Sequence, residues 1–142
     1  MNVLNILKVK GREVVTLSAA DRLSEAVRKL ARHRIGSLVV VDSQGRVVGI
    51  VSERDVVRVI AEAGNKALDM PVEAVMSSPV KTARESQSID DLMAQMTEFR
   101  VRHLPVVEQG KLVGMVSIGD VFKYRIEEIE FEAAAMRRYI SA

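Results

Sequence analysis

The sequence contains one ten-residue phrase twice. "GIVSERDVVR" occupies positions 49–58, and "GMVSIGDVFK" begins 65 residues later, with five of the ten positions identical. The identical residues include Gly, Ser and Asp, which hydrophobic patterning alone does not require. The chain is therefore internally duplicated, and any fold it adopts must accommodate the same unit twice.

The duplication extends well beyond the short phrase. "TLSAADRLSEAVRKLARHRIGSLVVVD" from Thr16 and "TARESQSIDDLMAQMTEFRVRHLPVVE" from Thr82 share one pattern at an offset of 66. In both, apolar residues recur at positions i, i+3, i+4 and i+7, which predicts one amphipathic helix in each copy. These apolar residues are Leu23, Ala26, Val27 and Leu30 in the first copy, and Ile89, Leu92, Met93 and Met96 in the second.

Two β-rich runs follow each predicted helix. "SLVVVD" and "RVVGIV" flank "SQG", and "HLPVVE" and "KLVGMV" flank "QG", which is the pattern of a hairpin with a glycine turn. A second helix is expected after Ser52 and after Ser117. Each copy is then a β-α-β-β-α unit, so we predict an α+β fold. One unit alone leaves an apolar sheet face bare, so we expect the two to pack as a pseudo-twofold pair with clefts between them.

Composition shifts suggest the boundaries of these units. We expect the first repeat over 1–63, a linker rich in turn-forming residues over 64–71, the second repeat over 72–126 and a helical extension over 127–142. Apolar residues along the second repeat's final helix are spaced 4, 3, 4, 3, 4, as in a heptad seam, at Phe122, Ile126, Ile129, Ala133, Met136 and Ile140. Nothing comparable follows the first repeat, so we predict that this seam packs on a second copy in a homodimer.

The tandem units resemble the cystathionine β-synthase (CBS) domain pair, or Bateman module, over about residues 1–126. Its signature is Gly, two apolar residues, Ser or Thr, two variable residues and Asp. The first copy meets it with Gly49, Ser52 and Asp55, and the second meets it at the corresponding positions, Gly114, Ser117 and Asp120. The resemblance implies a regulatory module that senses AMP, ADP or ATP, with NAD and S-adenosylmethionine as further candidates, and signals to a separate, unidentified partner protein.

The Ser-x-x-Asp motif has a chemical interpretation and a purely structural one. Unpaired N–H groups at a helix N-terminus attract phosphate, and a carboxylate accepts two hydrogen bonds from a ribose diol. On this interpretation Ser52 and Asp55, and Ser117 and Asp120, bind a nucleotide. Alternatively, each pair forms a capping box that only closes its helix. The two interpretations are compatible, and both stay open at this point.

The resemblance adds candidate residues around each motif. It places the apolar side chains of Ile50 and Met115 against the base. Thr16 and Thr82 precede the first helices and are candidates for contact with a base edge, although a role in a turn explains them equally well.

Basic residues distinguish the two copies. Arg102 and His103 open a strand of the second copy, where family members often contact phosphate, and Arg54 lies inside the first motif. The second hydroxyl residue that the family often has between Ser and Asp is missing from both copies. Because Arg102 and His103 add positive charge near it, we expect the cleft of the second repeat to bind a nucleotide more strongly.

Several other functions are disfavoured. The chain has two histidines, no cysteine and no phosphate-binding glycine loop or metal-ligand motif, so we expect no enzyme, metal site or required cofactor. Aromatic residues make up 4% of the chain, and the basic face around Arg28 to Arg34 has the pattern of a solvated helix, so no nucleic acid is expected. No apolar run is long enough to span a membrane and no signal peptide is evident, which favours a cytoplasmic protein. A ligand-independent interaction or scaffold module with vestigial clefts remains the alternative.

Overall fold

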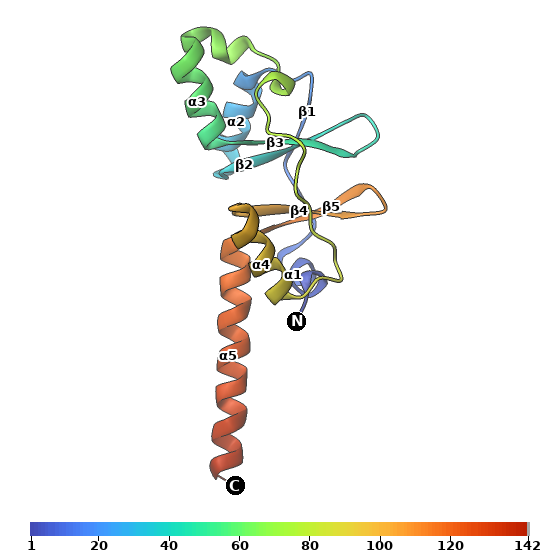
Figure 1. Cartoon of the computed structure of the whole chain (residues 1–142), viewed down its shortest axis with the longest axis vertical. Helices are drawn as coiled ribbons and strands as arrows, with labels where there is room; N and C mark the ends of the chain where they lie inside the picture. The colour runs from blue at the N-terminus through green and yellow to red at the C-terminus, as the bar shows by residue number, and fades with distance from the viewer. Residues whose placement is uncertain (142) are drawn as a thin grey trace.

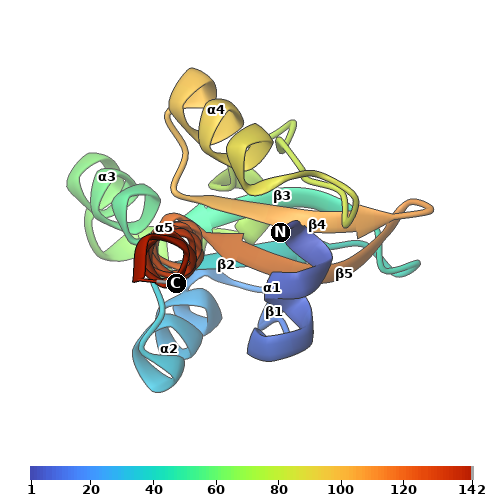
Figure 2. The same ribbon diagram turned by 90° about the horizontal axis from the view of Figure 1, so that it is seen from below.

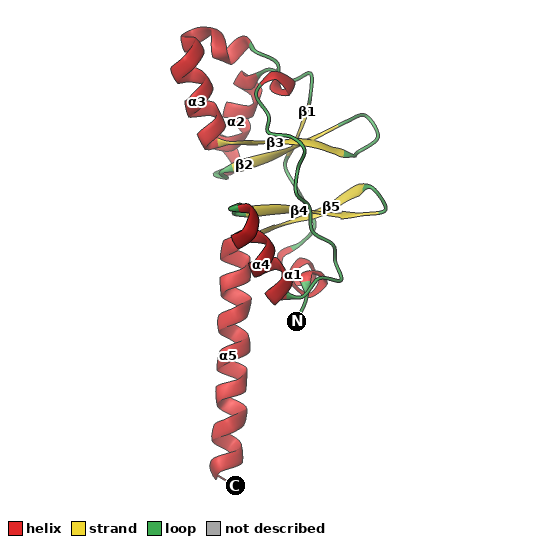
Figure 3. Cartoon of the chain, viewed as in Figure 1, coloured by secondary structure: helices red, strands yellow, loops and turns green. Residues whose placement is uncertain are grey.

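The computed structural model describes residues 1–141, and they form two halves whose sheets lie between two groups of helices (Figure 1, Figure 3). The first half contains β1 Thr16–Ser18, α2 Leu23–His33, β2 Ser37–Val41, β3 Val47–Ser52, α3 Glu53–Ala63 and two 3₁₀-helices, η1 Gly64–Asp69 and η2 Val72–Ala74. The second half contains α4 Ile89–Phe99, β4 His103–Glu108, β5 Lys111–Ser117 and α5 Ile118–Ser141, and α1 Val3–Lys10 precedes both. The predicted α+β duplication is confirmed. Over residues 1–141, no helix combines the length and apolar character needed to cross a membrane.

The predicted amphipathic helices are α2 and α4. Each buries the apolar stripe expected from its sequence: Leu23, Ala26 and Leu30 in α2, and Ile89, Leu92 and Met96 in α4. Both helices end at an arginine in the left-handed conformation, Arg34 and Arg100, each with φ of 54°. The same helix end therefore occurs in both repeats, as the duplication requires.

Both predicted hairpins are present. Strands β2 and β3 pair antiparallel, as do β4 and β5, and each pair has an irregularity in register near its middle. The second hairpin turns at Gln109 and Gly110, which have φ of 51° and 77°. A two-residue hairpin turn whose twist matches that of its strands requires a positive φ at both of its central residues. Gln109 thus adopts a conformation that Gly or Asn adopts more readily.

The first strand differs between the repeats. In the first, β1 pairs in parallel with β2 from Thr16 to Ser18, but in the second the corresponding pairing is a single bridge between Ala83 and Val106. The amides that follow Ala83 donate to side chains instead, to Oε1 of Gln87 and Oε1 of Glu108. The second repeat therefore has a two-stranded sheet, β4-β5, where the first has the order β1-β2-β3.

The core of each half includes a segment from outside its own helices and strands. Helix α1 joins the second half, and the segment between the repeats joins the first. Helix α1 contributes Val3, Ile6 and Leu7 to the core of the second half, which also includes Leu92 and Leu104. The segment between the repeats, where a linker is expected over 64–71, forms η1, and its Ala67 is buried in the first core together with Val72 and Val75 of the following segment. Helix α1 packs against β5 of the second sheet, and Figure 2 shows the two side by side.

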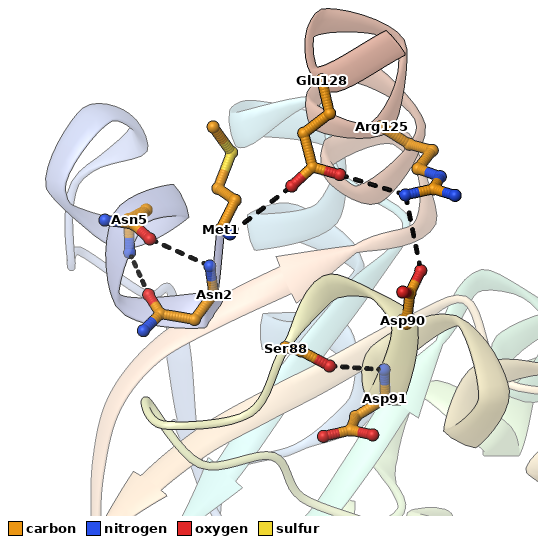
Figure 4. A network of polar contacts seen from close by, with 8 residues as sticks. All are labelled: Met1, Asn2, Asn5, Ser88, Asp90, Asp91, Arg125 and Glu128. Atoms are coloured by element: carbon orange, nitrogen blue, oxygen red, sulfur yellow. Dashed lines mark hydrogen bonds and ion pairs between the residues drawn. The ribbon is translucent and has the colours of Figure 1, made fainter. Parts of the chain in front are cut away.

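Helix α5 continues far beyond the second half (Figure 1). Only its first turns are buried, through Val121 and Tyr124. Further along, Arg125 contacts Asp90 and Glu128, and Glu128 also contacts the N-terminal amine of Met1 at 3.5 Å (Figure 4). Beyond these contacts the apolar seam is open in the single chain, with Ile129 54% and Met136 61% exposed.

Candidate functional site

Both Ser-x-x-Asp motifs form capping boxes. In the first, the amide of Asp55 donates to Oγ of Ser52 at 3.2 Å, and the amide of Ser52 donates to Oδ2 of Asp55 at 2.9 Å. In the second, Ser117 and Asp120 make the same two bonds with the same lengths. The capping interpretation is therefore confirmed in both repeats. It leaves open whether either aspartate also binds a ligand, because a carboxylate has acceptor sites for more than one partner.

The two aspartates differ in their remaining partners. Asp55 accepts from Arg58 on its own helix, with 3.1 Å between Nη2 and Oδ1. Asp120 accepts instead from Lys10, whose Nζ lies 2.6 Å from Oδ2 and also 3.0 Å from the carbonyl oxygen of Met115. Lys10 is the last residue of α1, and sequence reasoning did not single it out because it is 110 positions away from Asp120.

A pocket of about 510 Å³ lies between the two halves at the Asp55 motif. It is large enough for a nucleotide-sized ligand, since small-molecule sites usually enclose about 300–1,000 Å³. Its lining comes from both repeats: Gly36, Ser37, Ile50, Ser52, Glu53, Arg54, Asp55, Ser77, Pro79, Val80, Lys81, Arg100, Val101, Arg102 and His103.

Six of the residues singled out in the sequence line this pocket. Four come from the first repeat, and Arg102 and His103 come from the second; the four are Ile50, Ser52, Arg54 and Asp55. From the sequence, Arg102 and His103 are expected at the cleft of the second repeat. The structure places them on the pocket of Asp55, because the halves pack so that the start of β4 lies near the N-terminus of α3.

The other singled-out residues lie elsewhere. Met115, Ser117 and Asp120 belong to the second motif and do not line this pocket. Thr16 and Thr82 use their carbonyl oxygens to accept from the side chains of Lys29 and Gln95, at 2.7 and 2.8 Å. A lysine and a glutamine thus hold the start of the two repeats in the same way, through backbone carbonyl oxygens and not through the threonine side chains.

Positive charge is concentrated on the pocket. Arg54, Lys81, Arg100 and Arg102 line it, together with the acids Glu53 and Asp55. None of these four cations takes part in an ion pair with the residues of 1–141. Lys81 and Arg100 were not singled out in the sequence, because their positions in the loops around the second repeat's first helix carry no motif. The pocket therefore offers unpaired cations beside a carboxylate.

His103 lies where the two motifs approach each other. Burial lowers the pKa of His103, the positive charges of Lys10 and Arg102 lower it further, and the charge of Asp120 opposes this shift. Burial acts to raise the pKa of Asp120, but the hydrogen bonds from Lys10 and from the Ser117 amide outweigh it, so this pKa is lowered. His103 is thus neutral and Asp120 ionised near neutral pH. No three His, Asp or Glu side chains of the part of the chain that the structure describes are grouped to hold a metal ion.

Other proteins resemble this chain in sequence and in fold. The chain is 44% identical over 100 residues to an uncharacterized 17.7 kDa protein of Acidianus ambivalens, which covers 70% of this chain and 59% of that protein. The crystal structure of the CBS-domain containing protein ATU1752 from Agrobacterium tumefaciens matches with a TM-score of 0.82 and 42% identity, over 87% of this chain and 92% of that one. The CBS domain protein PAE2072 from Pyrobaculum aerophilum, solved in complex with AMP, matches with a TM-score of 0.75 and 30% identity, over 84% of this chain and 89% of that one.

The family model described as the CBS domain matches twice, at residues 8–62 and 72–127. The two matches contain the two Ser-x-x-Asp motifs, one in each, and the structure gives both motifs the same capping geometry. The resemblance recognised in the repeated phrase is confirmed. This chain belongs to the CBS domain family and carries two CBS domains in tandem.

Proposed function

We propose that this protein is a regulatory module that binds an adenosine-containing nucleotide in the pocket at Asp55. The observation that carries the proposal is the coincidence of a nucleotide-sized pocket, a motif aspartate and four unpaired cations in one place. The AMP complex of the Pyrobaculum relative supports the class of ligand.

The carboxylate and the apolar wall suit the nucleoside. Asp55 has a side chain that is 13% exposed. Among residues 1–141, its side-chain partner outside the capping box is Arg58 on the surface of α3. Two carboxylate oxygens retain acceptor sites for the adjacent hydroxyls of a ribose. Ile50, two residues before Ser52, lines the same pocket and offers an apolar surface to the base.

The cations suit the phosphates. Arginine and lysine bind phosphate oxygens through charge-assisted hydrogen bonds. Arg54 comes from α3, whereas Lys81, Arg100 and Arg102 come from the second repeat. A ligand with several negative charges, such as ATP or ADP, therefore matches the pocket better than an uncharged nucleoside. Such a ligand also bridges the two repeats, so its binding is expected to stiffen their arrangement.

The output of the module is proposed to pass through a homodimer and a separate partner protein. The exposed seam of α5, from Phe122 to Ile140, is the apolar surface that supports self-association. A heptad spacing allows two such helices to bury their seams against each other.

One observation favours a second candidate function. The capping boxes explain Ser and Asp in both repeats without any ligand. A scaffold module that binds partner proteins and no nucleotide therefore remains the alternative.

Calorimetric titration with ATP, ADP, AMP and adenosine separates the two functions. Asp55→Ala removes hydrogen bonds to a charged group and is expected to weaken nucleotide binding by about 10- to 150-fold. Asp120→Ala is the matched control, because it removes the same capping box from the other repeat but does not alter the pocket lining. If no adenosine ligand binds the wild type at millimolar concentration, the scaffold function is favoured. If both variants bind like the wild type, Asp55 does not hold the ligand and the proposed site is wrong.

A further inference from the structure

The two repeats have equivalent segments packed against their motif glycines. A side chain on Gly49 would collide with Met76, and a Cβ on Gly114 would lie 2.6 Å from Cδ2 of Leu7. Met76 and Leu7 therefore occupy corresponding places, one on each hairpin. This correspondence allows the residues that follow Met76 and Leu7 to be compared position by position.

Three residues further on, the two segments differ. After Met76 the chain is extended, and Pro79 lines the pocket at Asp55. After Leu7 the chain is still helical, and it reaches Lys10 at the end of α1. In the first repeat the amide of Ser77 donates to the carbonyl of Ile50 at 2.9 Å.

In the second repeat a side chain replaces that backbone donor. Nζ of Lys10 donates to the corresponding carbonyl, that of Met115, at 3.0 Å and reaches Oδ2 of Asp120 at 2.6 Å. A lysine ammonium thus lies against the motif aspartate of the second repeat, held at two points. In α1 the backbone amides are engaged within the helix, so a side chain and not an amide reaches this carbonyl.

The surroundings of the second motif also differ in charge from those of the first. The positions that correspond to Arg102, His103 and Arg54 in the other repeat are Gly36, Ser37 and Gly119. None of these three carries a charge that would attract phosphate. The lysine thus neutralises Asp120 on a side of the molecule where the counterparts of Arg54 and Arg102 are glycines, although Arg34 corresponds to Arg100.

We propose that Lys10 is a built-in occupant of the second site: its ammonium takes the place on Asp120 that ribose hydroxyls would take, so the chain binds one nucleotide and not two. This inference rests on the proposed function for the nature of the ligand. Lys10 acts here as a specificity-determining residue, since it decides which of two equivalent motifs is open. The ion pair between Lys10 and Asp120 also joins α1 to α5. Lys10 thus holds the second site together as a bound ligand would hold the first.

The test isolates the second site by removing the first. Calorimetric titration with ATP is expected to give one site per chain for the wild type. For Asp55→Ala it is expected to give binding about 10- to 150-fold weaker, too weak to saturate over the concentration range used for the wild type. Adding Lys10→Met to Asp55→Ala is expected to restore one site per chain, with affinity at least about tenfold above that of Asp55→Ala. Lys8→Met is the matched control, because Lys8 is an exposed lysine on the same helix turn and is expected to restore nothing.

The outcomes distinguish this inference from the proposed function. Binding by Asp55→Ala/Lys10→Met but not by Asp55→Ala supports the role of Lys10, even if the wild type were to bind nothing and the proposed pocket had to be abandoned. Failure of the double variant to bind, with a melting curve like that of Asp55→Ala, overturns the inference while leaving the pocket at Asp55 intact. Two sites in the wild type, one of which is lost in Lys10→Met, also overturns it, since Lys10 would then hold the ligand.

Discussion

Nζ of Lys10 lies 2.6 Å from Oδ2 of Asp120, so the last residue of the first helix is joined to the first turn of the last helix. The pair lies next to Ser117, whose capping box Asp120 also completes. The corresponding aspartate of the first repeat, Asp55, is bonded instead to Arg58 of its own helix. The second motif is therefore a junction between the two ends of the chain.

The Lys10–Asp120 pair gives the stability of the protein a defined pH dependence. Because the pKa of Asp120 is lowered in the folded state, its contribution is fully present above the unfolded pKa of about 3.9 and is lost as the pH falls through the lowered folded value. The Lys10 side chain is 38% exposed, so solvent screening limits the pair to about 0.5–1 kcal/mol.

Lys10→Met is therefore expected to lower the free energy of unfolding by that amount at neutral pH, and by less at about pH 2, which lies below the unfolded pKa of Asp120. Urea denaturation at both pH values measures this. Lys8→Met provides the baseline for losing a lysine from α1. A destabilisation by Lys10→Met that is the same at both pH values would show that packing, and not the ion pair, is responsible.

The contact between Gly114 and Leu7 predicts a steric requirement. Gly114→Ala places a Cβ against the buried Leu7 side chain, 2.6 Å from Cδ2, and is expected to cost about 1–3 kcal/mol of stability. Gly119→Ala is the control, because its Cβ would meet only Oγ of Ser117, at 3.6 Å. It is expected to change stability by no more than about 0.5 kcal/mol.

Combining Gly114→Ala with Leu7→Ala tests the mechanism directly. Removing the leucine side chain leaves space for the new methyl group, so the double variant should be more stable than the sum of the single effects predicts. Thermal or urea unfolding of the four proteins completes this cycle. Strict additivity would mean that α1 does not pack on β5 in solution.

The exposed seam of α5 predicts that the protein is a homodimer. Ile126→Asp and Ile129→Asp together place two charges in the seam and are expected to yield monomers, because a buried unpaired carboxylate opposes association. Phe131→Asp is the control, since Phe131 is 74% exposed on the same helix but lies outside the heptad positions. Light scattering gives the mass per particle. A monomeric wild type, or a seam variant that remains dimeric, would contradict the proposed interface.

His103 predicts a pH dependence of nucleotide binding. Burial, Lys10 and Arg102 lower the pKa of His103 while Asp120 opposes them, so the imidazole is neutral in the free protein near neutral pH. Phosphate groups in the pocket would favour the protonated imidazole, so affinity for ATP is expected to rise as the pH falls from about 8 to about 6, by up to about tenfold.

His103→Gln is expected to remove the part of the pH dependence of ATP affinity that comes from the protein. Only the part that comes from protonation of the ATP phosphates would remain. His33→Gln is the control, because the other histidine lies at the end of α2 and does not line the pocket. Calorimetric titrations across the pH range provide the measurement. An unchanged slope in His103→Gln would remove His103 from the site.

Local sequence patterns were sufficient to predict the repeated architecture. The apolar spacing of Leu23, Ala26 and Leu30, and its copy at Ile89, Leu92 and Met96, determines which face of each helix is buried. The glycine turns determine the two hairpins, and the Ser-x-x-Asp spacing determines the two capping boxes. These features depend on interactions between residues a few positions apart, so they can be read from a single stretch of chain.

Which motif lies on the pocket was decided only by the tertiary structure. Arg102 and His103 stand in the second repeat but line the pocket of Asp55, and Lys10 stands at the start of the first repeat but binds Asp120 of the second. These relationships depend on how two similar units pack and on α1 crossing to the second core, which brings together residues as far apart as 110 positions. Periodicity in the sequence shows which face of each helix or strand is buried. It does not show which face of the other repeat that surface contacts, because this depends on how both cores pack together.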